Sequence, residues 1–368
     1  MGAVSDAAAF RAQFPVLAER SYLNAGTEGP LPAAVTQAVT QRLAEETANG
    51  RSGKAYIEAV KDLAARVRAG YAALLGADPS DVALTGSTTD GCNTVLAGLD
   101  LRPGDQVITS DEEHPGLTAP LGRLRRRGVD VVVAPFARIA EAVTPQTRLV
   151  ACSHVSWVGG QVVDTEALTA TGVPFLLDAA QGIGAVPVDV ASLGCAFYAG
   201  SGQKWLCGPE GSGSLFVRRD MLDELVVPWP GYSSVAPQSD PLEFEPAPDA
   251  GRLDLGFPPG VRSTWTLASL GVFEAAGWDW VHERAATLAA SLAEQLAQHG
   301  LSVAPRGRST LVSWSVDDPE AEVARLAAEG IVVRSILSHG GLVRASAGAW
   351  SSEEEIARLA ELAATPAS

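Results

Sequence analysis

The sequence has few cysteines, and they form no pattern that suggests a metal or disulfide site. The four cysteines, Cys92, Cys152, Cys195 and Cys207, are scattered along the chain and lack the CxxC spacing of metal ligands. All four lie in apolar or glycine-rich surroundings, which is typical of buried free thiols in a reducing cytosol. We therefore expect no metal site in this protein.

Long hydrophobic runs and an excess of basic residues are also missing. No apolar segment is long enough to span a bilayer, and the start, MGAVSDAAAFRAQF, has no basic stretch followed by a long apolar run. The net charge of −16 and the pI near 4.7 argue against binding to nucleic acid or to anionic membranes. Neither a GxGxxG after a strand nor a Walker motif is present. We expect a soluble, cytoplasmic protein that is not a nucleotide-binding one.

What is present is the pattern of a globular protein with alternating strands and helices. Of the 368 residues, 46% are hydrophobic and 19% are charged. From about residue 82 short apolar stretches alternate with helical patterns, and the candidate strands cover residues 82–84, 106–109, 130–134, 149–153, 175–178, 196–199 and 214–217. This alternation predicts an α/β fold with a largely parallel, seven-stranded sheet.

The flanking segments follow other patterns. Helical periodicity covers 33–48 and 56–75, and a long helix begins near Ser263, breaks around 277–278 and continues to 299. A smaller α+β domain is predicted after it, with strands at 310–315, 331–334 and 342–346 and helices at 319–329 and 353–362. Residues 228–260 hold eight prolines and no steady periodicity. We expect this segment to be a loop at the active site or at a subunit interface.

The residues that carry chemistry lie between 175 and 218. Asp178 ends an apolar strand, at the carboxyl end where open α/β sheets bind ligands. Lys204 follows 26 positions later in the setting SGQKWLCGPEGSG. Desolvation there disfavours the ammonium form and lowers its pKa, which favours an amine able to form a Schiff base. An acid for a pyridinium nitrogen plus a Schiff-base lysine predicts a pyridoxal phosphate (PLP) site.

Four motifs resemble those of the class V aminotransferases, the family that includes cysteine desulfurases and isopenicillin N epimerase. They are DAAQ at 178–181, SGQKWLCGPEGSG at 201–213, YLNAGTEGPLP at 22–32 and LVRASAGAWSSEEEI at 342–356. The resemblance implies a fold type I PLP-dependent enzyme that forms a homodimer with active sites at the subunit interface. It also implies an N-terminal segment, 1–32, that packs with the small domain, a large PLP-binding domain, 33–260, and a small C-terminal domain, 261–368.

The resemblance assigns residues to the cofactor phosphate. GSTTDGCN at 86–93 opens a helix after a strand, so its N–H groups can bind an anion, and Thr88 and Thr89 match the phosphate-binding motif. Ser201 matches a further phosphate ligand. Gln203 stands where the family often has histidine, and it can still donate to a phosphate. Thr264 matches a residue that reaches the phosphate from the neighbouring subunit, although the glycine that precedes it in the family is serine here.

Other matches concern the cofactor ring and the substrate. His114 matches the histidine that stacks on the pyridine ring and moves protons, an assignment that suits a side chain titrating near neutral pH. Asp178 would keep the pyridine nitrogen protonated, and Gln181 would hydrogen-bond the phenolic oxygen. Lys204 would hold the cofactor and act as the base that removes the substrate Cα proton.

Three residues are expected to line the substrate pocket. Arg344 matches the arginine that binds the α-carboxylate, for which a guanidinium fork is suited. Asn24 would line the same pocket, and Trp157 replaces the asparagine common in desulfurases. His339 lies on the nearby loop, where it could transfer protons or simply be exposed.

A missing cysteine limits the reaction. Desulfurases of the family carry a persulfide-forming cysteine in the region that here reads RSILSHGGLVR, at 334–344, and this region has none. A thiolate nucleophile is therefore missing. We expect a PLP-dependent C–S lyase that acts on an amino acid by β-elimination. An aminotransferase and an amino-acid epimerase are the alternatives.

Overall fold

The computed structural model describes residues 6–237, 239–254 and 256–365. Within them, seven strands form one sheet in the order β2-β8-β7-β6-β5-β3-β4. These strands are β2 (Val82–Thr85), β3 (Gln106–Ser110), β4 (Asp130–Ala134), β5 (Thr147–Ser153), β6 (Phe175–Asp178), β7 (Phe197–Ser201) and β8 (Gly213–Val217). β8 runs antiparallel to β2 and β7, and the remaining neighbours are parallel. The expected mostly parallel seven-stranded sheet is confirmed.

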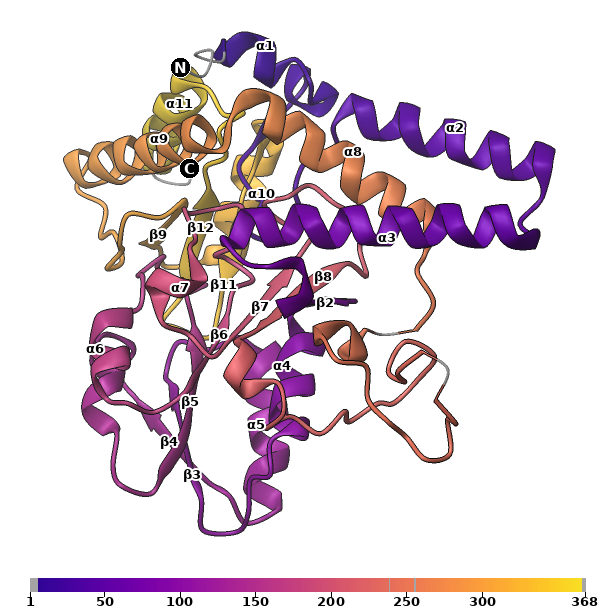
Figure 1. Cartoon of the computed structure of the whole chain (residues 1–368). Helices are drawn as coiled ribbons and strands as arrows, with labels where there is room; N and C mark the ends of the chain where they lie inside the picture. Colours follow the sequence, from indigo (N-terminus) through magenta and orange to yellow (C-terminus); the bar gives the residue numbers. More distant parts are fainter. Residues whose placement is uncertain (1–5, 238, 255, 366–368) are drawn as a thin grey trace.

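Helices cover both faces of this sheet (Figure 1). Along β6, Leu176 packs on one face with Leu121 of the helix that follows β3, whereas Phe175 and Leu177 pack on the other face with Tyr71. Successive strand residues point to opposite faces, so a sheet covered on both sides has near-continuous apolar strands. The helices of the described chain are α1 (Ala7–Arg11), α2 (Ala33–Asn49), α3 (Gly53–Leu75), α4 (Thr88–Gly98), α5 (Pro115–Arg126), α6 (Thr165–Ala170), α7 (Val190–Leu193), α8 (Gly260–Ala276), α9 (Trp278–Gln298), α10 (Pro319–Ala328) and α11 (Glu353–Ala363).

A smaller sheet lies in the C-terminal part of the chain. β12 (Leu342–Ser346) pairs antiparallel with β11 (Arg334–Ile336) on one side and with β9 (Leu311–Ser315) on the other. A separate two-stranded pair joins β1 (Ser21–Tyr22) to β10 (Ile331–Val332) in parallel. The N-terminal segment is thereby attached to the C-terminal part of the chain.

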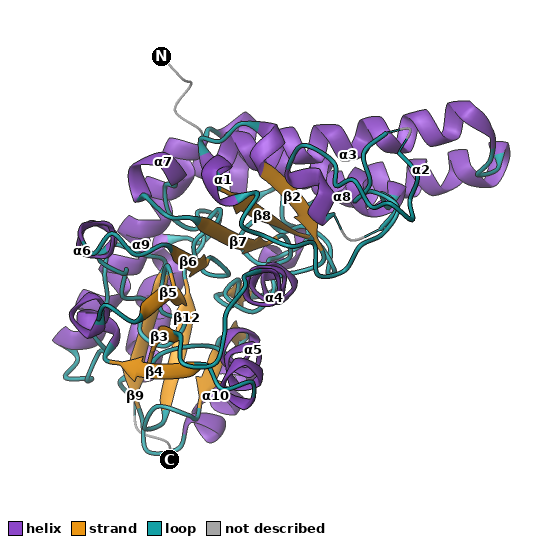
Figure 2. Ribbon diagram, turned by 60° about the horizontal axis from the view of Figure 1, so that its bottom comes forward, coloured by secondary structure: helices purple, strands orange, loops and turns teal. Residues whose placement is uncertain are grey.

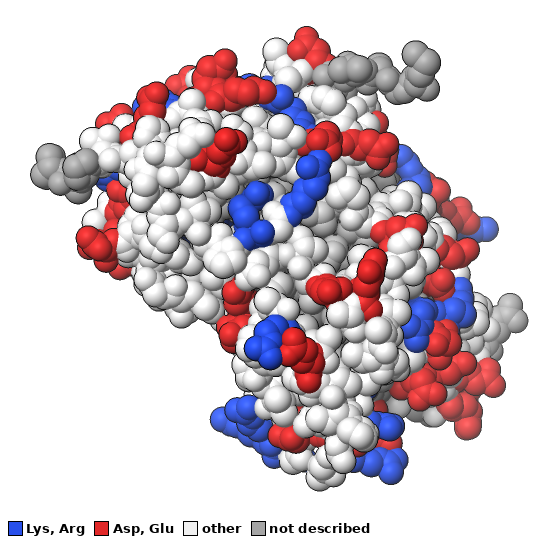
Figure 3. All heavy atoms as spheres, turned by 90° about the vertical axis from the view of Figure 1, so that its left-hand side faces the viewer, with Lys and Arg blue, Asp and Glu red and all other residues white. Residues whose placement is uncertain are grey.

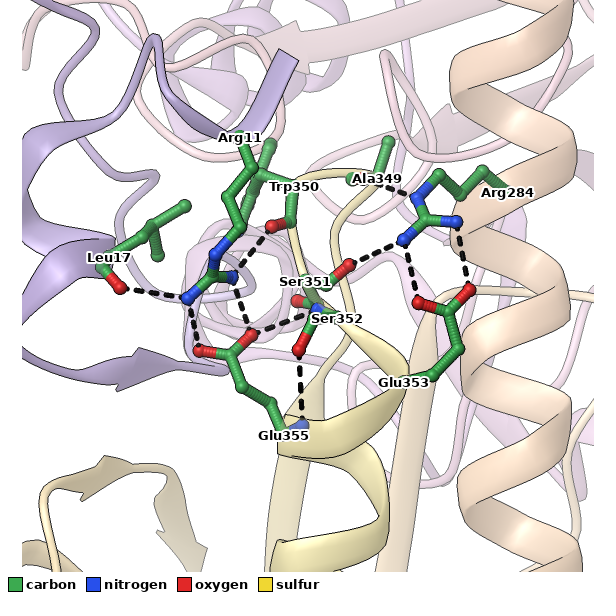
Figure 4. A network of polar contacts seen from close by, with 9 residues as sticks. All are labelled: Arg11, Leu17, Arg284, Ala349, Trp350, Ser351, Ser352, Glu353 and Glu355. Atoms are coloured by element: carbon green, nitrogen blue, oxygen red, sulfur yellow. Dashed lines mark hydrogen bonds and ion pairs between the residues drawn. The ribbon is translucent and has the colours of Figure 1, made fainter. Parts of the chain in front are cut away.

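A polar network strengthens this attachment (Figure 4). Arg11 of α1 forms two hydrogen bonds to the carboxylate of Glu355, at 2.7 and 2.8 Å, and a third to the carbonyl of Trp350 at 2.9 Å. Glu355 also accepts from the backbone of Ser352, which caps α11 in turn. A bidentate arginine–carboxylate pair fixes orientation as well as distance. It holds α1 against the start of α11.

The helices α2 and α3 form a pair that projects from the body of the molecule, with α8 beside both (Figure 2). The segment that follows β8 includes two 3₁₀ turns, Arg219–Met221 and Ala250–Leu253, and an isolated bridge between Val235 and Pro246. Among the described helices none combines the length and apolar character that crossing a membrane requires. On the face shown in Figure 3, acidic and basic side chains are interspersed among uncharged ones.

One expected strand differs from the structure. The pattern at 331–334 predicts a single strand, but the chain changes partners at Val333: β10 pairs with β1, and β11 pairs with β12. The physical reason is that the break depends on pairing with strands far away in the sequence, and local hydrophobicity does not reveal strand partners. The predicted limits of the three parts of the chain stay a prediction.

Candidate active site

The predicted residues gather at the carboxyl edge of the large sheet. Asp178 is the last residue of β6, and it lies in register with Ser153 at the end of β5. Ser201 ends β7. Because parallel strands bring their carboxyl ends to one edge, these residues lie next to the loops that follow β2 and β3. The topology thus brings Thr88 and His114 to the same edge.

Lys204 lies in a closed turn above this edge. The turn is held by Gly202, which donates its N–H to the carbonyl of Ser212 and accepts from Gly208, each at 2.8 Å. Desolvation lowers the pKa of Lys204 to about 8, while the charge of Asp178 acts in the opposite direction. Burial in turn raises the pKa of Asp178, and Lys204 lowers it. An amine and a carboxyl close enough to affect each other therefore share this pocket.

The chain has three lysines, and the other two differ from Lys204 in their setting. Lys54 and Lys61 are exposed on α3. Burial, and the lowered pKa that it causes, distinguish Lys204. Lys204 is thus the lysine whose environment favours covalent chemistry.

The start of α4 offers hydroxyl groups without partners. Ser87 caps the helix by accepting from the backbone N–H of Asp90 at 3.1 Å. The hydroxyls of Thr88 and Ser201 are buried and have no hydrogen-bond partner in the described chain. Thr89 packs against Gly116 at the start of α5. Buried hydroxyls are rarely left unpaired, so those of Thr88 at the start of α4 and Ser201 at the end of β7 are available to a polar ligand.

Gln203 and Gln181 lie on either side of the lysine turn. The side-chain oxygen of Gln203 is buried without a partner, while its backbone carbonyl accepts from Gly29 at 2.8 Å. Gln181 donates to the carbonyl of Gly26 at 2.8 Å and accepts from Trp205 at 2.9 Å. One amide hydrogen of Gln181 is left for the predicted bond to a phenolic oxygen.

His114 begins α5 and stands against Trp157. Its Nδ1 accepts a hydrogen bond from the backbone N–H of Gly116 at 3.1 Å, which leaves the proton of the neutral ring on Nε2. The imidazole meets the indole of Trp157 edge to face, with ring centroids 5.2 Å apart. Burial first, and then the charges of Lys204 and two arginines, lower the pKa of His114 to about 4. The ring is therefore neutral at pH 7.

Arg344 of β12 is fully buried and close enough to Lys204 to affect its pKa. Its Nη1 donates to the carbonyl of Trp157 at 2.7 Å, whereas Nε and Nη2 have no partner in the described chain. Asn24 forms a bridge with Ser346 next to Arg344, and its side chain accepts from Thr27 at 2.9 Å. The free Nε and Nη2 form one edge of the guanidinium, which is the geometry that binds a carboxylate bidentately.

Thr264 is the predicted cofactor residue that α8 carries. It lies in the first turns of α8, and its hydroxyl donates to the carbonyl of Gly260 at 3.0 Å. It forms no hydrogen bond to the other predicted site residues of the described chain. His339 lies at the rim, where its Nε2 meets the carbonyl of Asp111 at 3.1 Å and its ring stands 6.1 Å from that of Trp157.

The motif resemblance assigns no role to three charged residues that lie near the site. Glu113 is buried and accepts hydrogen bonds from the backbone and hydroxyl of Ser153. Glu28 is close enough to affect the pKa of Lys204. Arg334 stands over the ring of Trp157, with its guanidinium carbon 5.7 Å from the ring centroid. The sequence held a signal for each of them, since Glu113 directly precedes His114, Glu28 lies within the motif at 22–32, and Arg334 begins the segment 334–344.

Known proteins match this chain over almost its entire length. The model of the family "Aminotransferase class-V" matches residues 21–359. A probable cysteine desulfurase of Methanothermobacter thermautotrophicus is 32% identical, with 95% of this chain and 96% of the relative covered. Isopenicillin N epimerase of Streptomyces clavuligerus is 28% identical, with 92% and 93% covered.

The solved structures of C-DES, a cystine C–S lyase, are also similar. Its complex with the product cysteine persulfide has a TM-score of 0.89 at 29% identity and covers 96% of this chain and 99% of C-DES. A lysine-to-alanine variant of C-DES, with glycine covalently linked to the PLP cofactor, has a TM-score of 0.90 at 29% identity and covers 96% and 98%.

The pocket described above suits the group that C-DES holds. A phosphate needs donors, and unpaired hydroxyls are offered by Thr88 at the N-terminus of α4 and by Ser201 at the end of β7. A pyridinium nitrogen needs an acid, and Asp178 is buried at the base of the pocket. An aldehyde needs an amine with a lowered pKa, which Lys204 supplies. The cofactor of this protein is PLP.

Proposed function

This chain belongs to the class-V aminotransferase family of PLP-dependent enzymes, and from that premise we propose that it is a C–S lyase acting by β-elimination. Its substrate would be an amino acid that carries a sulfur substituent on Cβ. The products would be a thiol or persulfide, pyruvate and ammonia. The similarity to the cystine C–S lyase C-DES supports this proposal.

The absence of an accessible thiol carries the proposal. The turn between β11 and β12, residues 337–341, contains no cysteine. The four cysteines of the chain are all free and buried elsewhere. Cys207, the one nearest Lys204 in sequence, is 2% exposed, and burial raises the pKa of its thiol far above the usual range. A thiol that is neither ionised nor reachable cannot attack a substrate sulfur.

The residues of the chain supply binding and proton transfer. Bound PLP supplies an electron sink that stabilises negative charge at the substrate Cα. Asp178 would accept a hydrogen bond from the protonated ring nitrogen, and neutral His114 would lie against the ring face. The Lys204 amine would hold the cofactor at rest and remove the Cα proton once the substrate has taken its place.

The substrate would be oriented by its carboxylate. The free edge of Arg344 can bind both carboxylate oxygens, and its burial excludes water from that contact. After Lys204 takes the Cα proton, the Cβ–S bond breaks, and sulfur leaves with the bonding electron pair and gains a proton. Water hydrolyses the remaining three-carbon fragment to pyruvate and ammonia, so atoms balance with one water consumed.

Product analysis tests the proposal. Purified protein loaded with PLP is incubated with cystine and with cysteine S-conjugates, and pyruvate, ammonia and sulfane sulfur are quantified. We expect equal amounts of pyruvate and ammonia. Amino-group exchange with an added keto acid, without pyruvate from the sulfur substrate, would show an aminotransferase instead. Racemised substrate without pyruvate would show an epimerase.

The assembly that we propose is a homodimer in the cytoplasm, with active sites at the subunit interface. The family resemblance supports it, because the residue that Thr264 matches reaches the phosphate from the neighbouring subunit. Ile57 and Leu43 on the projecting pair α2 and α3 are exposed apolar residues that a partner could cover. Four reduced cysteines fit a reducing compartment.

A further inference from the structure

Gln181 stands in a closed turn directly after the strand that ends at Asp178. The carboxylate of Asp178 accepts from the backbone N–H of Ala180 at 3.0 Å. Gly182 donates its N–H to the carbonyl of Ala179 at 2.9 Å. These bonds fix the backbone of Gln181 at the carboxyl edge of the large sheet. Its side chain is buried, so its amide needs hydrogen-bond partners in the protein or in a ligand.

The two partners of the Gln181 amide define one orientation of that amide. The carbonyl of Gly26 can only accept, and it lies 2.8 Å from Nε2. The indole N–H of Trp205 can only donate, and its nitrogen lies 2.9 Å from Oε1. If the amide were turned over, an oxygen would face the carbonyl and an amide N–H would face the indole N–H. Both hydrogen bonds would then become repulsive contacts.

This orientation leaves one N–H of Nε2 for a ligand. Such a donor suits the phenolic oxygen of PLP, because a hydrogen bond to a charged oxygen favours its charged form. An amide oxygen in the same place would repel it. Trp205 directly follows Lys204 in the sequence and is buried, so the indole is attached to the turn that carries the amine.

We propose that Trp205 is a positioning residue that acts on the cofactor through Gln181. Its indole N–H holds Oε1, and the amide therefore presents an N–H to the phenolic oxygen. Without the indole N–H, Oε1 would be buried with no partner, a state that costs free energy and favours rotation of the amide. This role is the same for a lyase, an aminotransferase or an epimerase, so it does not depend on the proposed reaction.

A pH titration of the bound cofactor tests the proposal in Trp205→Phe, which keeps an aromatic ring but has no N–H. The measured quantity is the spectral midpoint, the pH at which the visible absorbance of the holoprotein has changed by half. The transition is the loss of the proton that the phenolic oxygen shares with the nitrogen of Lys204. A donor stabilises the negative charge that stays on the oxygen, so its loss should raise the midpoint. We expect a rise of roughly 0.5–1 pH unit, the worth of one neutral hydrogen bond.

A double-variant cycle separates positioning from packing. Gln181→Ala alone should raise the spectral midpoint, and adding Trp205→Phe to it should cause no further rise. Trp205→His keeps a ring N–H, and its midpoint should lie closer to that of the wild type. The charged groups that act on Lys204 are the same in all variants, so their effects cancel; they are Asp178, Arg344, Arg334 and Glu28.

Trp350→Phe is the matched control. Trp350 is fully buried in the same apolar cluster as Trp205, but its indole nitrogen has no partner in the described chain. This variant loses the same volume and no hydrogen bond, so its spectral midpoint should equal that of the wild type. An unchanged midpoint in Trp205→Phe or in Gln181→Ala would overturn the proposal. So would an equal rise in Trp350→Phe, or a full further rise when Trp205→Phe is added to Gln181→Ala.

Discussion

Burial shifts the pKa values of individual site residues towards their uncharged forms. Desolvation lowers the pKa of Lys204 to about 8 and that of His114 to about 4, and it raises the pKa of Asp178. Perturbed groups of this kind cluster at functional sites. The consequence for catalysis is specific. The amine loses its proton near neutral pH, the ring stays uncharged, and a cationic partner such as a pyridinium would favour the ionised form of the carboxyl.

Glu113 makes the stability of the protein depend on pH. Burial raises its pKa to about 7, against the opposing effect of hydrogen bonds from Ser110 and Ser153. A raised carboxyl pKa stabilises the fold below the unfolded value near 4.5, and that stability is lost as pH rises through about 7. The free energy of unfolding of Glu113→Gln relative to wild type should therefore increase between pH 5 and pH 8, by on the order of 3 kcal/mol.

Urea unfolding of both holoproteins at several pH values measures this difference. Other titrating groups contribute equally to both proteins, so they cancel. A difference that stays constant from pH 5 to pH 8 would show that Glu113 is ionised throughout, held by its serine partners.

Among the elements, the segment at 24–29 passes between two parts of the site. Its two glycines leave room for this close approach. Gly26 accepts from Gln181, and a Cβ at this position would lie 2.8 Å from Nη2 of Arg344. Gly29 donates to the carbonyl of Gln203, and its Cβ would lie 2.2 Å from the carbonyl oxygen of Lys204. The N-terminal segment thus contacts both the substrate side and the lysine turn.

Gly29→Ala should disturb this contact. The clash is with backbone, which cannot move away as a flexible side chain can, so we expect a loss of about 1–3 kcal/mol in unfolding free energy. We also expect weaker retention of PLP, because the lysine turn must shift. Gly122→Ala is the matched control, since a Cβ there meets nothing within 4 Å in helix α5. Thermal unfolding and cofactor absorbance measure both effects, and equal behaviour of the two variants would contradict the close approach.

The elements that could be predicted are those whose limits follow from the local sequence pattern. β4, β6 and β12 have the predicted limits because each is a short apolar run. Asp178 and Lys204 could be found because one follows such a strand and the other stands in a glycine-rich turn. The partner change at Val333 and the opposition of Arg334 to Arg344 depend on pairing between distant segments. No local pattern contains that information.

At the scale of the whole molecule, we propose that dimerisation completes the active sites. Thr264 of each subunit would then reach the cofactor phosphate in the site of the other subunit. Mixed dimers of Lys204→Ala and Thr264→Ala subunits test this directly. If Thr264 serves the partner's site, a mixed dimer has one intact site, built from the wild-type Lys204 of one subunit and the wild-type Thr264 of the other. Mixing the variants under exchanging conditions should then increase PLP retention and pyruvate formation above the mean of the two parents. No increase would indicate that Thr264 acts within its own chain or not at all.

The proposed chemistry depends most on Lys204 as the amine that holds PLP. Borohydride reduction of the holoprotein followed by peptide mapping tests this most directly, because the chain has three lysines and Lys54 and Lys61 are both exposed on α3. We expect one pyridoxyl group per chain, on the peptide that contains Lys204, and none in Lys204→Ala. An adduct on Lys54 or Lys61, or no adduct at all, would contradict it.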